Sequence, residues 1–384
     1  MAKRMSTGAV VKAGNRRITR IETLHAPKLE AVDHQPGGAR RKPTMTDVAR
    51  LAGVSQTSVS LILNQTVAAR ISQATRDRVI AMARDVGYEL PGGRPLLANG
   101  SRRNMIAYIV DEISTSPHAV VSLDGARDAA WESGFLVATH VTRSNPEIEA
   151  TTVESIVTDS NVVGVIYSTI FTRRVSPPSA LLKLPCVLLN CHSADKVTPC
   201  VVPAEVVGAF RATQYLLGKG HRRIGFINGE PWMEASVDRL KGYRQALATA
   251  DIAFDAKLLR SGDWLPLQGY QLALDLMRLH DAPTAIFCGN DLMAMGALEA
   301  AAKLGLRVPE DLSIMGYDDQ ELARYTHPPL STLVLPNYEM GRRAAELVID
   351  MACNKESRTP KTAKIEGPLI ERDSVAMPGR RWVT

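Results

Sequence analysis

Residues 47–64 read DVARLAGVSQTSVSLILN, in which the apolar pattern of one short helix stops and another begins at once. Gly53 is expected to end the first helix, because glycine readily adopts the positive φ that closes a helix. Thr46 is expected to cap its start. Its apolar, inward-facing stripe, with the 3.6-residue period of a helix, is expected to consist of Val48, Ala49, Leu51 and Ala52. The stretch therefore predicts two helices separated by a tight turn.

The second helix carries the polar groups that suggest a function. Ser55 is a suitable cap, and Gln56 and Thr57 then stand in the first turn, where such side chains can read base edges in a DNA major groove. Ser60 and Leu61 share the outward face. The inward-facing residues are expected to be Val59, Ile62 and Leu63.

A third amphipathic segment, SQATRDRVIAMARDVGYEL, begins at Ser72. Its apolar residues are spaced to close a small core with the first two helices: Val79, Ile80, Ala83 and Val86. A generic three-helix bundle with polar faces is the alternative to a DNA-binding head.

Positive charge is concentrated in the first quarter of the chain. Residues 1–43 hold 10 Lys and Arg against 3 Asp and Glu, and residues 44–103 hold 8 against 4, although the net charge of the whole chain is only +6. This division predicts a basic head that meets a polyanion and a body that does not. Residues 1–43 are expected to be a disordered basic tail, either a solvated extension or a source of nonspecific phosphate attraction.

Length and composition set the class of protein. A chain of 384 residues exceeds one ordinary domain, and no apolar run approaches the roughly 18 residues of a membrane span. The first residues lack the apolar core of a secretory signal, so the expected location is cytoplasmic, with no membrane partner. The five cysteines form no CxxC pair, which predicts reduced, mostly buried thiols and no metal site.

From Asn104 onward, strand-like segments alternate with helical ones. The strand candidates are MIAYIV, FLVATHV, VVGVIYS, CVLLN, RIGFIN, TAIFCGN and LSIMGY, and helices are expected near 119–133 and 146–159. Such alternation predicts an α/β fold with parallel, doubly wound sheets in two lobes. In such sheets, ligands bind beyond the carboxyl ends of the strands.

Several polar residues stand at or just beyond the predicted strand ends. Asn190, Asn290 and Asp318 follow strand candidates, and Arg239 is expected to open a helix. Their carboxamide, carboxylate and guanidinium groups donate and accept hydrogen bonds as sugar hydroxyls require. Trp264 could pack on the apolar face of a sugar ring.

Each of these residues also has a structural interpretation. Asn290 could cap the following helix, and Asp318 with Asp319 could form a turn. Arg239 could pair with Asp238 or Glu234.

The segments MTDVARLAGVSQTSVSLILN and ISQATRDRVIAMARDVGY resemble the DNA-binding head of the LacI/GalR family of bacterial transcription regulators. The resemblance continues through GHRRIGFINGE, VDRLKGYRQAL, the long segment that begins TAIFCGNDLMAMGALEAAAKLGLRVPEDLSIMGYDD, and EGPLIERDSV. It thus covers nearly everything after residue 43, with several motifs in the family's order.

This resemblance implies roles for residues of the head. Gln56 and Thr57 would be the main base readers. Leu61 replaces an arginine that is common there, which puts in doubt any operator preference inferred from arginine-bearing relatives, because leucine cannot contact guanine through two hydrogen bonds. The residues implied near phosphates or in capping are Ser55, Ser58, Ser60 and Asn64.

The segment LPGGRPLLANGSRR resembles the family's hinge, a short helix whose leucine enters the minor groove. Leu97 stands at the place of that leucine. Gly92, Gly93 and Pro95 are poor helix residues, so any hinge helix should start near Pro95 and end by Gly100. A plain flexible linker is the alternative.

For the body, the resemblance implies a periplasmic-binding-protein fold with an effector between two lobes. Arg239, Asn290 and Asp318 match effector-pocket positions, and Trp264 and Asn190 match more loosely. His118 stands where an aromatic residue is common, either as a ligand contact or as a surface or capping histidine. Relatives commonly have Asp-Asn where this chain has Ala204 and Glu205.

The sequence therefore predicts a sequence-specific transcriptional repressor controlled by a small carbohydrate. A homodimer on operator DNA is expected, because a single head reads too few base pairs. The expected divisions are a tail (1–43), a helix-turn-helix head (44–89), a hinge linker (90–103) and an effector-binding and dimerisation domain (104–384). A nucleobase, a sugar phosphate or a protein corepressor is the alternative effector. A free solute-binding protein is a less favoured class, and no enzyme motif or cofactor is expected.

Overall fold

A computed structural model describes residues 43–63, 71–88, 104–115, 117–194, 197–353 and 362–379. The side chains of four helical residues inside these ranges are also outside the description: Thr57, Leu61, Gln73 and Arg84. Three predicted features lie beyond the described residues: nearly all of the basic tail, Asn64, and the hinge with Leu97.

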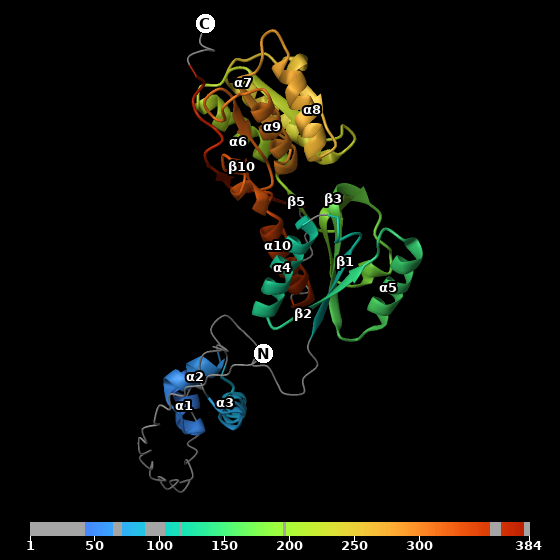
Figure 1. The fold of residues 1–384 in the computed structure, drawn as a ribbon. Helices are drawn as coiled ribbons and strands as arrows, with labels where there is room; N and C mark the ends of the chain where they lie inside the picture. Colours follow the sequence, from blue (N-terminus) through green and yellow to red (C-terminus); the bar gives the residue numbers. More distant parts are fainter. Residues whose placement is uncertain are drawn as a thin grey trace, which may run out of the picture.

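The head consists of three helices, which confirms the pattern in the sequence. They are α1 (Met45–Ala52), α2 (Gln56–Leu63) and α3 (Gln73–Asp85) (Figure 1). All the predicted core residues of α2 and α3 are buried or packed against the buried cluster. Leu51 is the exception in α1, because 45% of its surface is exposed. The predicted inward position of Leu51 is therefore wrong.

The cap of α1 also differs from the prediction. Thr44 is the N-cap, and its backbone N–H and hydroxyl both donate to Asp47 Oδ2, at 2.8 and 2.7 Å. Thr46 is the second residue of the helix and is exposed. Its predicted capping role is wrong, because Asp47 at the third helical position completes a capping box with Thr44 and so fixes the cap two residues earlier. Gly53 ends α1 at a φ of +63°, as predicted.

The first lobe of the body is built on a parallel sheet of six strands. Their order across the sheet is β11-β5-β4-β3-β1-β2. The strands are β1 (Met105–Val110), β2 (Leu136–Val141), β3 (Val162–Val175), β4 (Cys186–Ser193), β5 (Cys200–Pro203) and β11 (Thr362–Ile365). The helices are α4 (Pro117–Glu132), α5 (Pro146–Thr158), the short η1 (Leu181–Lys183) and α10 (Asn337–Cys353).

The second lobe has a parallel sheet of four strands in the order β7-β6-β8-β9. The strands are β6 (Ile224–Asn228), β7 (Leu259–Ser261), β8 (Ala285–Cys288) and β9 (Ser313–Met315). The helices are α6 (Glu205–Gly218), α7 (Glu234–Thr249), α8 (Pro266–Met277) and α9 (Asp291–Lys303), with short turns η2 (Ala256–Leu258) and η3 (Glu321–Arg324). An antiparallel pair, β10 (Thr332–Leu333) and β12 (Leu369–Ile370), adjoins this lobe.

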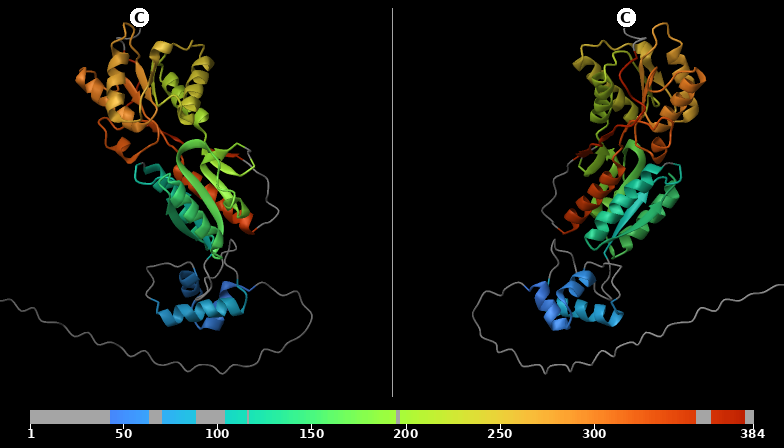
Figure 2. Two further views of the ribbon diagram at one scale, coloured as in Figure 1. Left: turned by 90° about the vertical axis from the view of Figure 1, so that its right-hand side faces the viewer. Right: turned by 60° about the vertical axis from the view of Figure 1, so that its left-hand side comes forward.

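The chain passes between the lobes more than once. It leaves the first lobe after β5, builds the second lobe from α6 to β10, and returns through α10, which packs beside α4 (Figures 1 and 2). After β11 it crosses again to β12. The α/β architecture with parallel sheets in two lobes is thus confirmed. Helices cover both faces of each sheet, so the carboxyl ends of the strands are the places where loops can present polar groups.

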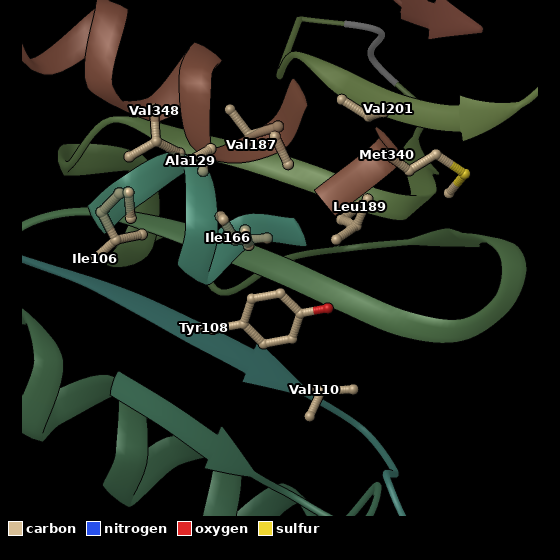
Figure 3. Close-up of a cluster of buried hydrophobic side chains, with 14 of the residues drawn as sticks. Ile106, Tyr108, Val110, Ala129, Ile166, Val187, Leu189, Val201, Met340 and Val348 are labelled. Carbon is tan, nitrogen blue, oxygen red and sulfur yellow. The ribbon is translucent and has the colours of Figure 1, made fainter. Parts of the chain in front are cut away.

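The cores follow from the strand pattern. In the first lobe, alternate residues of β1, such as Ile106 and Tyr108, point toward α4 and α10 and are fully buried there (Figure 3). Gly125 and Gly341 let these two helices approach closely, because a β-carbon on either would collide with the other helix's backbone. Four of the five cysteines are buried and all five are free, as predicted, with Cys353 exposed. In the described part of the chain, no helix is long and apolar enough to cross a membrane.

Candidate functional site

The start of α2 is the part of the head best suited to meet DNA. Ser55 precedes the helix, and its Oγ accepts a hydrogen bond from the backbone N–H of Ser58 at 3.1 Å, which confirms the predicted cap. Gln56 is the first helical residue and is exposed. The first turn contains no acidic residue, so the positive end of the helix dipole is not neutralised there. A phosphate can therefore approach this end of α2 favourably.

The other residues implied for DNA contact are placed less completely. Ser58 and Ser60 are half-buried on α2, and Thr46 is exposed on α1. Thr57 and Leu61 belong to α2, but their side chains lie outside the described part of the chain, as do Asn64 and Leu97.

Arg239 is the centre of the polar cluster in the second lobe. It lies in the second turn of α7, which begins at Glu234, so it does not open the helix as expected. Its residue surface is only 3% exposed. Nε and Nη2 donate to the two carboxylate oxygens of Glu205 at 2.7 and 2.8 Å, and Nη1 donates to the carbonyl of Gly289. The guanidinium also stacks on the ring of Tyr317, 3.8 Å from its centroid.

The electrostatics of this cluster follow from burial and from Glu205. Burial disfavours the charged form of Arg239, yet the neighbouring carboxylate of Glu205 more than compensates and raises the pKa of the guanidinium. Burial, and then the charge of Glu205, raise the pKa of Tyr317. Arg239 is therefore a buried cation held by the Glu205 carboxylate. Among the described residues, neither Asp238 nor Glu234, the partners suggested from the sequence, forms an ion pair with Arg239.

Asp318 lies beyond the end of β9, as the sequence predicted. Its side chain is 4% exposed, and Oδ1 lies 3.7 Å from Arg239 Nη2, which is an ion pair too long for a good hydrogen bond. Oδ2 accepts from Gln320 Nε2 at 3.2 Å. Oδ1 is buried and has no hydrogen-bond partner among the described residues. A buried acceptor of this kind favours any ligand that brings a donor to it.

Asp291, the first residue of α9, is completely buried near Asp318. Burial, and then the negative charge of Asp318, raise the pKa of its carboxyl group well above the ordinary value. The negative charge of Asp318 thus disfavours the charged form of Asp291.

Asn290 and Trp264 adjoin this cluster. Asn290 caps α9, with its Oδ1 accepting from the Met293 backbone at 2.9 Å, so its structural role is confirmed. Its Nδ2 donates to the Trp264 carbonyl, also at 2.9 Å. The Trp264 ring lies 5.5 Å from the Arg239 guanidinium and packs so closely on Gly229 that any side chain there would collide with it. These contacts hold the indole beside Arg239.

His118 and Asn190 come from the first lobe. His118 is the second residue of α4, and its Nε2 lies 3.4 Å from Asp318 Oδ2, so it connects the two lobes. Asn190 does not end its strand, because β4 continues to Ser193. Its carboxamide accepts from Thr172 Oγ1 at 2.6 Å and donates to the Thr169 carbonyl at 3.1 Å. It therefore holds the irregular part of β3 in place.

Three of these residues have unusual backbone conformations. Asn190, Trp264 and Asp318 have φ values of +56°, +69° and +108°. Tryptophan rarely adopts positive φ, and a φ of +108° lies outside the left-handed region that aspartate tolerates. Such strain persists only where surrounding contacts impose it, and it is commonest at functional sites. Trp264 and Asp318 both adjoin Arg239, so their conformations favour a binding role for its surroundings.

Several residues of the lobe junction were not predicted. Glu205 is 5% exposed and pairs with Arg239 across 34 residues of sequence. The only signal was its departure from the Asp-Asn pair of relatives. Across the junction, His192 Nε2 lies 2.8 Å from Glu234 Oε2, and the rings of Phe171 and Trp232 meet edge to face at 5.8 Å.

Asp111, directly after β1, was also missed. Its Oδ2 accepts from Arg173 Nη2 at 2.9 Å, and its Oδ1 accepts from the Ile170 backbone at 3.0 Å. Burial nevertheless raises the pKa of Asp111, against the opposing effect of Arg173. Its position at the end of a strand was a signal that could have identified it.

Comparison with known proteins shows the family. The sequence profile described as "Bacterial regulatory proteins, lacI family" matches residues 44–89, and the profile "Periplasmic binding protein-like domain" matches residues 213–375. The HTH-type transcriptional repressor CytR of Escherichia coli (strain K12) is 36% identical over 316 residues, which cover 80% of this chain and 89% of that protein. The chain belongs to the LacI family of bacterial regulatory proteins.

Solved structures of LacI-family proteins agree with this assignment. A "transcriptional regulator CelR-cellobiose complex" is 30% identical, covers 87% of this chain and all of its own, and superposes with a TM-score of 0.60. A LacI-family regulator from Rhizobium etli is 31% identical and covers 71% of this chain and 99% of its own, with a TM-score of 0.66. The protein is thus a DNA-binding transcription regulator with a helix-turn-helix head and a periplasmic-binding-protein-like body.

Proposed function

We propose that this LacI-family protein represses transcription by binding operator DNA as a homodimer, and that a small carbohydrate bound between its lobes controls that binding. The observation that carries the proposal is the cluster of Arg239, Asp318 and Asn290 at the carboxyl ends of the second-lobe strands, joined to the first lobe by His118. A ligand at this junction contacts both lobes, so it can bias their relative position.

On the DNA side, we assign base reading to Gln56 and Thr57, at the start of α2. The residues proposed for phosphate contact or for support of this helix are Thr46, Ser55, Ser58, Ser60 and Asn64. Leu61 can contact a thymine methyl group. Leu97 in the hinge segment 90–103 is proposed as a minor-groove wedge. A two-fold dimer doubles the number of base pairs that are read, and thereby the specificity.

On the effector side, the chemistry of the junction suits a polyol. Asp318 offers an unpartnered acceptor, Asn290 retains donor and acceptor capacity, and the Trp264 ring is held beside Arg239. The CelR complex, a relative of similar fold, contains cellobiose. The relatives compared are transcription regulators, and we assign this protein no catalytic step.

Gel-shift titration on an operator mapped beside neighbouring genes tests the DNA part of the proposal. Gln56→Ala should lower operator affinity by about fivefold to 150-fold while leaving binding to scrambled DNA nearly unchanged, since base contacts are worth about 1–3 kcal/mol each. Equal losses on both DNAs would contradict base reading by Gln56. Calorimetry with cellobiose, other sugars, sugar phosphates and nucleobases tests the effector part, and tighter binding of a nucleobase would replace the carbohydrate.

A further inference from the structure

The pair formed by Glu205 and Arg239 bears on which effectors the lobe junction can accept. We infer that Glu205 is a specificity-determining residue that makes this site select uncharged ligands with hydroxyl or amino donors and reject phosphates and carboxylates. The inference rests on the proposed effector site and narrows its ligand class.

The N–H groups with which Arg239 could bind an anion already donate to acceptors of the protein. Arginine has five N–H donors, and anions are recognised mainly through its bidentate edge. In this protein, the edge formed by Nε and Nη2 is occupied by both oxygens of Glu205, and Nη1 donates to the Gly289 carbonyl. A phosphate or carboxylate ligand would have to displace Glu205 to obtain the same contact.

Displacement of Glu205 from Arg239 by a ligand would be unfavourable. Arg239 and Glu205 are 3% and 5% exposed, and the Arg239 side chain is held between Tyr317 and Trp264. A displaced Glu205 would remain buried without its cation, which is strongly unfavourable. Because the charges of Glu205 and Arg239 cancel, Asp318 adds a further negative charge that repels an approaching anion.

The hydrogen-bonding group that remains for a ligand is the carboxylate of Asp318. Asp318 Oδ1 is buried, lies 3.7 Å from Arg239 Nη2 and has no hydrogen-bond partner among the described residues. An acceptor requires a donor from the ligand. Hydroxyl and amino groups supply one, whereas a carboxylate or a fully ionised phosphate monoester group does not. The occupied Nε/Nη2 edge of Arg239 and the unpartnered Asp318 oxygen therefore favour the same ligand class.

The charge of Glu205 can be tested separately from its size. A carboxamide at position 205 could accept one hydrogen bond from the guanidinium but could not neutralise its charge. The Glu205→Gln variant should therefore release an anion-binding edge on Arg239.

Thermal unfolding of the full-length chain tests this, with inorganic phosphate as the probe and sodium chloride of equal ionic strength as the reference. Phosphate should raise the Tm of Glu205→Gln by several degrees more than that of the parent chain. The Glu205→Gln/Arg239→Gln double variant should lose this extra increase. Glu371→Gln is the matched control on an exposed glutamate and should behave like the parent. The DNA-binding head is the same in all four proteins, so its phosphate binding cancels.

Two results would overturn the inference: an unchanged phosphate response in folded Glu205→Gln, or a phosphate response of the parent that Arg239→Gln abolishes. If Glu205→Gln does not fold, calorimetry of the parent with ribose and ribose 5-phosphate, glucose and glucose 6-phosphate, and adenosine and AMP decides. Binding confined to uncharged members supports the inference, and Arg239-dependent binding of a phosphorylated member overturns it. Operator binding is measured separately, so failure of the repressor proposal is distinguishable.

Discussion

At the scale of single residues, Asp318 is the strongest sign that part of this structure is shaped for binding and not for stability. It combines a φ of +108°, a buried carboxylate oxygen without a hydrogen-bond partner, and a second buried carboxyl group, Asp291, in its neighbourhood. An unsatisfied buried acceptor costs about 1–3 kcal/mol. Such a cost is expected where a ligand supplies the missing donor.

This predicts that Asp318→Gly removes effector binding without destabilising the protein. Glycine relieves the positive φ, and Arg239 keeps Glu205 as its partner, so the free energy of unfolding should stay equal or rise. Asp319→Gly is the matched control, because Asp319 also has positive φ but accepts from Arg372 Nη2 at 2.6 Å. Loss of the Asp319 carboxylate should lower the free energy of unfolding, measured by urea denaturation, by about 1.5–3 kcal/mol. A larger loss for Asp318→Gly than for Asp319→Gly would contradict this account.

His221 provides a prediction about pH. It is buried, with Nδ1 2.8 Å from Thr284 Oγ1 and Nε2 2.9 Å from the Ala376 carbonyl. Burial lowers its pKa below the ordinary 6.5. Below pH 6.5 the unfolded chain therefore binds a proton that the folded chain does not, and stability falls as pH decreases toward the folded-state pKa. The decrease in Tm between pH 7.5 and 5 should be smaller in His221→Gln. An equal decrease in both proteins would exclude this histidine as a cause.

The residues that the sequence could and could not identify differ in a physical way. Asp318 and Asn290 could be selected from the sequence because they lie just beyond the ends of β9 and β8, and that position is readable from local pattern. The pairing of Arg239 with Glu205 was not predictable, because it depends on how α6 and α7 pack against each other. Asn290 caps α9, as its structural interpretation predicted. Its contact with a ligand stays a proposal.

At the scale of elements, α1 shows why helix boundaries are harder to predict than helix existence. Both Thr44 and Thr46 are good capping residues, and the apolar pattern alone does not choose between them. The choice is made by Asp47, which accepts from the backbone and the hydroxyl of Thr44. The seven strands predicted for the body are present, although β3 and β4 extend beyond their apolar cores as polar segments. The short strands β5, β7, β10, β11 and β12 were not predicted.

The capping box yields a prediction on head stability. Thr44→Ala should destabilise α1 by about 1 kcal/mol, because it removes the cap of an eight-residue helix. Thr46→Ala, at an exposed helical position, should change stability by less than about 0.5 kcal/mol. Hydrogen exchange of the α1 amides in the full-length chain measures both effects. Greater loss of protection in Thr46→Ala would show that the helix begins later than described.

At the scale of the whole molecule, the two lobes meet through a few identifiable side chains. His118 reaches Asp318, His192 reaches Glu234, and Phe171 meets Trp232. Sequence analysis predicted two lobes with a ligand between them. It did not predict these contacts, because they depend on the relative position of the two lobes, between which the chain crosses several times. The contacts are small, so the equilibrium between lobe arrangements should respond to weak perturbations.

The pair of His192 and Glu234 is best suited to test this, because its side chains are 36% and 43% exposed and lie away from the buried cluster around Arg239. An exposed pair contributes at most about 1 kcal/mol, so Glu234→Gln should leave Tm nearly unchanged. It should nevertheless shift the lobes apart, which X-ray scattering would detect as an increased radius of gyration of the ligand-free chain. Effector affinity should fall by up to about fivefold, in proportion to the closed population.

Glu371→Gln is the control for that prediction. It breaks an exposed pair with Lys219 at 3.3 Å, of similar chemistry, but both of its residues belong to the second lobe and its adjoining strands. It should change neither the radius of gyration nor effector affinity. If the two variants scatter identically, the lobe positions are fixed by the half-buried contact of His118 with Asp318 and by the crossing segments. In that case His118→Ala, and not Glu234→Gln, should open the molecule.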